Sequence, residues 1–194
     1  MRSVCIFCGS RSGIEPAYEE AALTLGRMLA AASITLVYGG GCVGLMGVVA
    51  DAALDAGGDV VGVIPRALLE REIAHTGLED LRVVGSMHER KALMSELSEG
   101  FVALPGGTGT LEEFFEALTW AQLGEHRKPC GLLNVGGYYD PLLALFDHMV
   151  VKGFLSEEHR SMVLVEREPD PLLEAMARYR PPGGVPKWIG SAET

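Results

Sequence analysis

The chain has 194 residues, of which 48% are hydrophobic and 22% charged, so it is long enough to bury one core without disulfides or metals. Its formal net charge of −10 argues against non-specific binding to nucleic acid or to an anionic membrane, because both need a basic surface. No apolar run approaches the length of a membrane span, and the N-terminus lacks the layout of a signal peptide. We therefore expect a cytoplasmic protein.

Short β-branched runs alternate with segments of helical apolar spacing along the chain. The runs predict strands at residues 3–7, 34–38, 60–64, 81–84, 101–104, 130–134 and 162–165. The segments between them predict helices at residues 17–32, 45–56, 88–97, 110–123, 141–151 and 171–179. This alternation favours an α/β fold, a Rossmann-like doubly wound parallel sheet in a single three-layer domain over residues 1–180. Residues 181–194, rich in Pro and Gly, predict an extended or poorly ordered tail.

Two cysteines near the N-terminus, Cys5 and Cys8, have C-x-x-C spacing, which is found in zinc and redox sites. Cys5 lies in the first predicted strand, and no second C-x-x-C or His pair completes a metal site. We expect buried or loop thiols in a reducing compartment, and neither a metal nor a cofactor.

A first glycine loop follows the second predicted strand. Gly39, Gly41 and Gly44 match G-x-G-x-x-G between a strand and a helix, the pattern of a dinucleotide site. Dinucleotide sites of this kind have an Asp or Glu near the end of the next strand that binds the ribose hydroxyls, but here that strand ends in Pro65-Arg66. NAD(P) binding is therefore disfavoured. The alternative is a tight turn that lets a helix pack closely on the sheet, with or without substrate contact.

A second glycine loop follows the fifth predicted strand. Gly106, Gly107 and Gly109 fall within four residues, and Thr108 and Thr110 add hydroxyl groups before a helix expected near Thr110. Glycines let backbone N–H groups approach an anion, and a helix N-terminus adds partial positive charge. The loop predicts a phosphate cradle, with a plain strand-to-helix turn as the alternative. No G-K-[ST] follows, which disfavours ATP hydrolysis.

Charged residues flank this cradle in the sequence. Glu112 and Glu113 fall in the first turns of the expected helix, where they either face the cradle or serve the helix dipole, with Thr110 and Glu113 at capping-box spacing. Arg90 and Lys91 are adjacent cations near the carboxyl end of the fourth strand, either on a solvated helix face or as phosphate ligands.

Two motifs at these positions, M-H-E-R-K at 87–91 and P-G-G-T-G-T-L-E-E at 105–113, together resemble the "Lonely guy" family of cytokinin riboside 5′-monophosphate phosphoribohydrolases. The likeness covers about residues 3–166 and implies a Rossmann-like homodimer without a cofactor. It implies hydrolysis of the N-glycosidic bond of an adenosine 5′-monophosphate, plain or N6-modified, to the free base and ribose 5-phosphate. By position in the motifs, Arg90 and Glu113 would be the catalytic pair. The nucleotide site would be lined by Glu72, Lys91, Gly106, Gly107, Thr108, Gly109, Thr110, Leu111, Glu112 and Thr119.

Two questions stay open at this point. A non-catalytic nucleotide or molybdenum-cofactor binding protein would share the cradle, although the presence of both Arg90 and Glu113 favours an enzyme. The preferred base is also open, since Thr108 occupies a variable position of the motif that is often aromatic in plant members. The label "lysine decarboxylase", often given to this family, finds no support, because no lysine has the setting of a Schiff-base residue.

Overall fold

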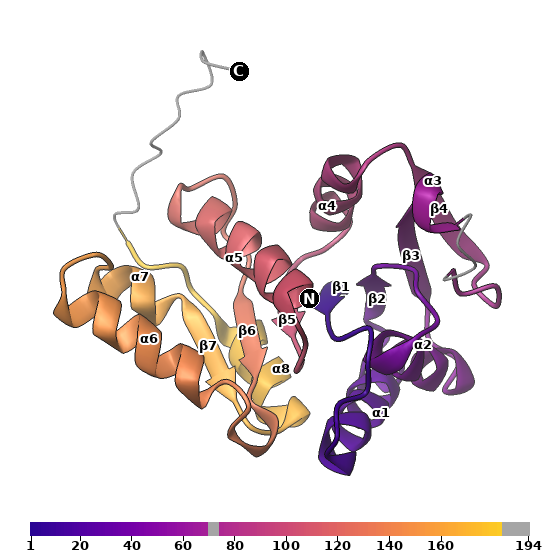
Figure 1. Ribbon diagram of the computed structural model, residues 1–194, viewed down its shortest axis with the longest axis horizontal. Helices are drawn as coiled ribbons and strands as arrows, with labels where there is room; N and C mark the ends of the chain where they lie inside the picture. Colours follow the sequence, from indigo (N-terminus) through magenta and orange to yellow (C-terminus); the bar gives the residue numbers. More distant parts are fainter. Residues whose placement is uncertain (70–73, 184–194) are drawn as a thin grey trace.

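A computed structural model describes residues 1–69 and 74–183, which form one sheet of seven parallel strands in the order β4-β3-β2-β1-β5-β6-β7 (Figure 1). The strands are β1 (Ser3–Phe7), β2 (Thr35–Tyr38), β3 (Val60–Pro65), β4 (Asp80–Val84), β5 (Phe101–Ala103), β6 (Cys130–Leu133) and β7 (Val163–Glu166). The helices are α1 (Pro16–Ala31), α2 (Gly44–Asp55), α3 (Arg66–Leu69), α4 (Met87–Glu96), α5 (Thr108–Gln122), α6 (Asp140–Val151), α7 (Glu157–Ser161) and α8 (Pro169–Arg178), with a 3-10 turn η1 (Val135–Gly137). The expected α/β fold is confirmed.

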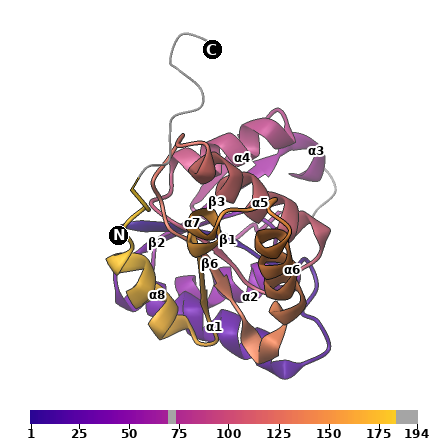
Figure 2. The ribbon, with the colours of Figure 1, turned by 90° about the vertical axis from the view of Figure 1, so that its left-hand side faces the viewer.

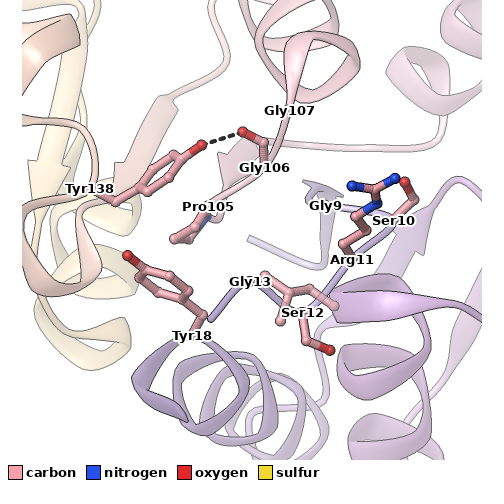
Figure 3. A pocket seen from close by; sticks show the side chains of 11 residues that line it. Gly9, Ser10, Arg11, Ser12, Gly13, Tyr18, Pro105, Gly106, Gly107 and Tyr138 are labelled. Atoms are coloured by element: carbon pink, nitrogen blue, oxygen red, sulfur yellow. Dashed lines mark hydrogen bonds between the residues drawn. The ribbon is translucent and has the colours of Figure 1, made fainter. Parts of the chain in front are cut away.

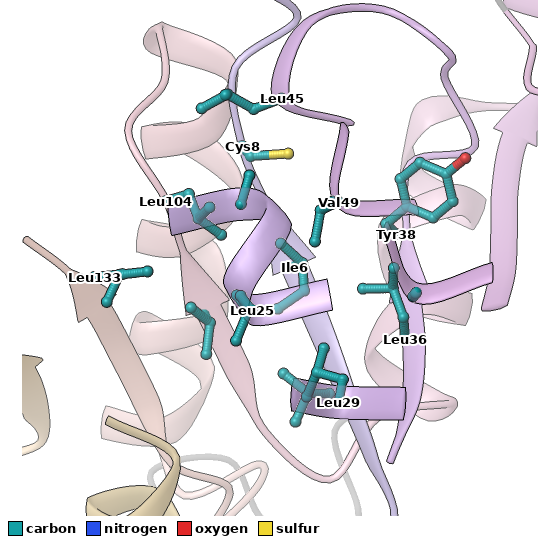
Figure 4. Close-up of a cluster of buried hydrophobic side chains, with 14 of the residues drawn as sticks. Ile6, Cys8, Leu25, Leu29, Leu36, Tyr38, Leu45, Val49, Leu104 and Leu133 are labelled. Carbon is teal, nitrogen blue, oxygen red and sulfur yellow. The ribbon is translucent and has the colours of Figure 1, made fainter. Parts of the chain in front are cut away.

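The sheet lies between two layers of helices, as Figure 2 shows, with α1, α2 and α8 on one face and α4, α5 and α6 on the other. Successive strand residues point to opposite faces. In β1, Ile6 therefore joins the cluster of α1 and α2 that Figure 4 shows around Leu25 and Val49. Phe7 joins the cluster on the other face. Strands β5 and β6 are buried on both faces and apolar throughout, whereas the edge strand β4 is only partly buried and carries Asp80 and Arg82.

The same alternation settles the role of the two N-terminal cysteines. Cys5 and Cys8 are three residues apart, and their side chains belong to the clusters on opposite faces of the sheet. Both are free, buried thiols, as expected. Burial raises the pKa of the Cys8 thiol well above its usual range, so this group stays protonated and is a poor nucleophile.

Element boundaries differ from the prediction mainly at helix starts. Helix α5 begins at Thr108 rather than Thr110, and α1 and α8 each include a proline in the first turn, a position that proline tolerates well. The short helices α3 and α7 were not predicted, because four or five residues carry no clear apolar period. Of the predicted tail at residues 181–194, residues 184–194 lie outside the described residues.

The strand order reverses between β1 and β5. The chain builds β1 to β4 toward one edge of the sheet and then returns to place β5 beside β1. Loops at the carboxyl ends of two such strands leave a crevice where ligands of α/β proteins bind. Here the loops touch, since the Gly9 amide donates to the Pro105 carbonyl at 3.1 Å.

No helix in residues 1–69 or 74–183 has the length and hydropathy needed to cross a membrane.

Candidate active site

A cavity of about 310 Å³ opens at the carboxyl ends of β1 and β5. It is lined by side chains and backbone of four segments, namely Cys8, Ser10, Met46, Met87, Arg90, Gly107, Thr108, Gly109, Thr110, Glu112 and Glu113. The structure thus brings together two motifs that residues 92–104 separate in the sequence, one from α4 and one from the start of α5.

Arg90 and Glu113 form an ion pair inside this cavity. The Arg90 Nη2 to Glu113 Oε1 distance is 3.1 Å, and each side chain is only 10% exposed. The Arg90 Nε–H group is buried and has no hydrogen-bond acceptor among the described residues. A buried donor without a partner is costly.

Glu113 titrates abnormally in this setting. Burial raises the pKa of its carboxyl group above the ordinary value, while the Arg90 guanidinium opposes that change and the neighbouring Glu112 carboxylate adds to it. Loss of hydration on burial therefore outweighs the charge of Arg90 in setting the direction of this pKa shift. A carboxylate with a raised pKa is a better proton acceptor.

Helix α4 aims Arg90 through a well-formed cap. The Ser86 Oγ accepts a hydrogen bond from the Glu89 amide at 3.1 Å, and the Glu89 carboxylate accepts one from the Gly85 amide at 2.7 Å. This reciprocal pattern closely resembles a capping box. It fixes the first turn of α4, and Arg90 is the next residue along.

Gly39, at the end of β2, provides the space that Arg90 occupies. A Cβ atom at this position would lie 2.0 Å from the Arg90 Nη2 atom. Gly44 has a positive φ of 58°, and a Cβ there would lie 2.3 Å from the Arg11 amide nitrogen. Two glycines of the G-x-G-x-x-G pattern therefore serve close packing. They also follow β2, one strand away from the reversal in strand order, which favours the tight-turn alternative over a dinucleotide site.

The second glycine loop leads directly into α5. Gly107 is the N-cap residue and no side chain caps the helix, so the first backbone N–H groups lack intrahelical partners. A Cβ atom at Gly107 or Gly109 would meet nothing within 4 Å, and neither residue has positive φ. Packing within the protein thus does not require glycine at these two positions. Bare backbone borders the cavity instead, as an anion cradle needs.

The capping-box alternative for Thr110 and Glu113 is wrong. The N-cap is Gly107, and the Glu113 carboxylate pairs with Arg90. Thr110 is buried beneath the loop, where its Oγ1 lies so close to Gly106 that a Cβ there would approach it to 2.1 Å.

Tyrosines from the β6–α6 connection hold the cradle in place. The Tyr138 hydroxyl donates to the Gly106 carbonyl at 2.5 Å (Figure 3), and the Tyr139 hydroxyl donates to the Leu104 carbonyl at 2.6 Å. Asn134 in turn accepts a hydrogen bond from the Tyr139 amide at 2.7 Å. Sequence reasoning assigned these residues no role, although the G-Y-Y run at 137–139 fell within the family likeness.

Three of the expected nucleotide contacts, Lys91, Leu111 and Thr119, do not line this cavity. The Lys91 ammonium pairs with the carboxylates of Glu112 and, at 3.1 Å, Glu116. Leu111 packs against the core. Thr119 is exposed and donates to the Phe115 carbonyl at 2.7 Å; it follows Thr108 by eleven residues, roughly 16 Å along the helix. Glu72 lies outside the described residues. In residues 1–69 and 74–183, no three His, Cys, Asp or Glu side chains are grouped to hold a metal.

Comparison with known proteins agrees with the motifs. The family model described as "Possible lysine decarboxylase" matches residues 46–176. The cytokinin riboside 5′-monophosphate phosphoribohydrolase LOG of Oryza sativa subsp. japonica is 47% identical over 180 residues, 93% of this chain and 74% of its own. LOG7 of Arabidopsis thaliana, with the same description, is 48% identical over 93% of this chain and 83% of its own.

Among solved structures, the molybdenum cofactor carrier protein of Chlamydomonas reinhardtii superposes with a TM-score of 0.68 over 91% of this chain and 96% of its own, at 21% identity. That likeness supports the fold alone. The sequence relatives are 47–48% identical over 93% of this chain. The chain belongs to the family of cytokinin riboside 5′-monophosphate phosphoribohydrolases, whose family model carries the description "Possible lysine decarboxylase".

Proposed function

We propose that this protein hydrolyses the N-glycosidic bond of adenosine 5′-monophosphate or its N6-modified forms, releasing adenine or a cytokinin base and ribose 5-phosphate. The observation that carries the proposal is the buried Arg90–Glu113 pair, which lines one cavity with the uncapped N-terminus of α5. The activity named for relatives that are 47–48% identical supports it. A carrier would not need a buried carboxylate with a raised pKa beside the cradle.

In the proposed mechanism, backbone N–H groups of the Gly107–Thr110 segment and the α5 dipole bind the 5′-phosphate and fix the ribose. The C1′–N bond breaks with its electron pair going to the base, and an oxocarbenium-like cation develops on the sugar. The Glu113 carboxylate opposes this cation and accepts a proton as water adds to C1′. The departing base takes up one proton, so neutral base and ribose 5-phosphate are released and Glu113 returns to its ionised form. Arg90 orients Glu113 through their ion pair and contacts the substrate from the cavity wall.

None of the lysines in the described part of the chain fits the alternative chemistry of a pyridoxal-phosphate decarboxylase. Lys91 is paired with two carboxylates, and the Lys128 ammonium donates to the Ser95 carbonyl at 2.7 Å. Lys152 lies exposed just after α6. The family description "Possible lysine decarboxylase" therefore has no chemical counterpart in the described cavity.

We expect Glu113→Gln to abolish release of the base while the protein still binds AMP, because the amide keeps the size of the carboxylate but cannot oppose a cation or accept a proton. Arg90→Ala should lower kcat/KM by about 100- to 1000-fold, the usual effect of removing one fixed donor from a desolvated site. Chromatography of AMP and isopentenyladenosine monophosphate reactions measures base release. The matched control is Glu174→Gln, which makes the same change in a side chain that is exposed on the surface of α8. Wild-type turnover by Glu113→Gln would refute the role.

Gly109→Ala tests the cradle. The added Cβ meets no protein atom within 4 Å, and alanine is favoured over glycine in a helix by up to about 1 kcal/mol. We therefore expect thermal unfolding at the same or a higher temperature, together with a KM for AMP raised by about 10-fold or more, because the methyl group enters space that the phosphate needs. An unchanged KM in a folded protein would place the phosphate elsewhere.

In a plot of kcat/KM against pH, the loss of activity at low pH should report protonation of Glu113. Because the pKa of this carboxylate is raised, the enzyme should lose activity at a higher pH than it would with an ordinary glutamate. The Glu116 carboxylate raises this pKa and the Lys91 ammonium lowers it. Glu116→Gln should therefore move this loss of activity to lower pH, and Lys91→Met should move it to higher pH. Shifts of the same sign in the two variants would contradict the assignment.

We further propose that the protein is a cytoplasmic homodimer. The free thiols suit a reducing compartment. Helix α6 and the turn after it expose Leu145, Val151 and Phe154, the last by 88%, an apolar surface that a second copy would cover. Thr119 lies roughly 16 Å along the helix from the cradle of its own chain, so a nucleotide contact by Thr119 would belong to the partner's site.

Subunit mixing tests this arrangement. Arg90→Ala and Thr119→Val chains, each impaired alone, should regain activity when unfolded and refolded together, because one site of the mixed dimer then has both residues intact. Sedimentation should give twice the chain mass of 20.7 kDa. A monomer, or a mixture no more active than its parts, would overturn the shared site.

A further inference from the structure

A second cavity adjoins the candidate active site. It measures about 460 Å³ and lies at the reversal of strand order, between the loop that follows β1 and the loop that follows β5 (Figure 3). Tyr18 and Tyr138 form one wall, with their rings edge to face at 5.8 Å. Ser10 and Gly107 line both cavities, so the two spaces meet at the cradle.

The charge of this second cavity differs from that of the whole protein. Among the described residues that line it, Arg11 is the only charged one and none is acidic, although the chain carries a net charge of −10. Arg11 makes no hydrogen bond or ion pair with any residue in 1–69 or 74–183, whereas Arg90 and Lys91 are both paired with carboxylates. Arg11 is thus the cation beside the cradle whose charge the described protein leaves unneutralised.

Backbone packing fixes where the Arg11 loop lies. The Gly9 amide donates to the Pro105 carbonyl at 3.1 Å, and the Leu45 amide donates to the Gly9 carbonyl at 3.0 Å. Gly44 packs directly against the Arg11 backbone. The loop that carries Ser10 and Arg11 is therefore held between the start of α2 and the cradle loop.

We propose that Arg11 binds the 5′-phosphate of the nucleotide from the side of the cradle away from Glu113, with the Ser10 hydroxyl as a second donor. This inference rests on the proposed function, which places the phosphate at Gly107–Thr110. Arginine presents a planar fork that matches two phosphate oxygens. An acidic protein repels a phosphate dianion, so a local unneutralised cation is what draws it in.

The test is the affinity of an Arg11→Ser variant for ribose 5-phosphate, AMP and adenosine, measured by calorimetry. We expect ribose 5-phosphate and AMP to bind about 10- to 100-fold more weakly, the usual effect of losing a charged hydrogen bond, and adenosine to bind as it does to the wild type. Arg11→Lys, which keeps a point charge, should recover part of the loss. Arg178→Ser, which removes an exposed cation at the end of α8, should change none of the three.

The outcomes separate this inference from the proposed function. Unchanged affinity of Arg11→Ser for ribose 5-phosphate overturns the inference even if the wild type hydrolyses AMP. An equal loss for adenosine and AMP also overturns it, because the contact would then not be with phosphate. Selective loss of phosphate binding in a protein that never releases a base would support the Arg11 subsite and refute the hydrolase. Circular dichroism and thermal unfolding confirm that each variant is folded.

Discussion

The site depends on keeping two opposite charges out of water. Arg90 and Glu113 are each about nine-tenths buried, and either charge alone would be strongly destabilising in that position. Together they compensate each other, at the cost of a carboxyl group that holds its proton more tightly than usual. The same desolvation strengthens every electrostatic contact that a substrate makes in the cavity. The surrounding architecture, from the cap of α4 to the glycine at the end of β2, serves to hold this pair in place.

The reversal of strand order explains how the pair is assembled. The half of the sheet from β1 to β4 leads into α4 and supplies Arg90, while β5 leads into the cradle and Glu113. Hydrogen bonds from Tyr138 and Tyr139 then tie the cradle to the β6–α6 connection. The cavity is therefore built by both halves of one sheet, and a displacement of either half would separate the cation from the carboxylate.

Much of the fold could be predicted from the sequence, because strands buried on both faces and helices with one apolar face leave clear periods of two and 3.6 residues. The pairing of Arg90 with Glu113 was implied by the family resemblance that their motifs carry, and not by local pattern. The rest depends on neighbours distant in the chain. Capping-box spacing occurs both at Ser86–Glu89 and at Thr110–Glu113. Only the first forms a cap, because Ser86 is the N-cap of α4, whereas α5 begins at Thr108 and Thr110 lies inside it. Likewise, the Lys91 ammonium forms ion pairs with Glu112 and Glu116 on α5, and no local sequence pattern indicates these contacts.

The contact between Gly39 and the Arg90 guanidinium links two positions that lie fifty-one residues apart in the chain. A descendant that lost the arginine would be released from the steric demand at the end of β2, and alanine or serine would become tolerable there. Residue identity at these two positions should therefore vary jointly across the family. A family member with a larger residue in place of this glycine could not place the arginine guanidinium as Arg90 is placed here. Such a member would be a candidate for a binding protein without catalytic activity.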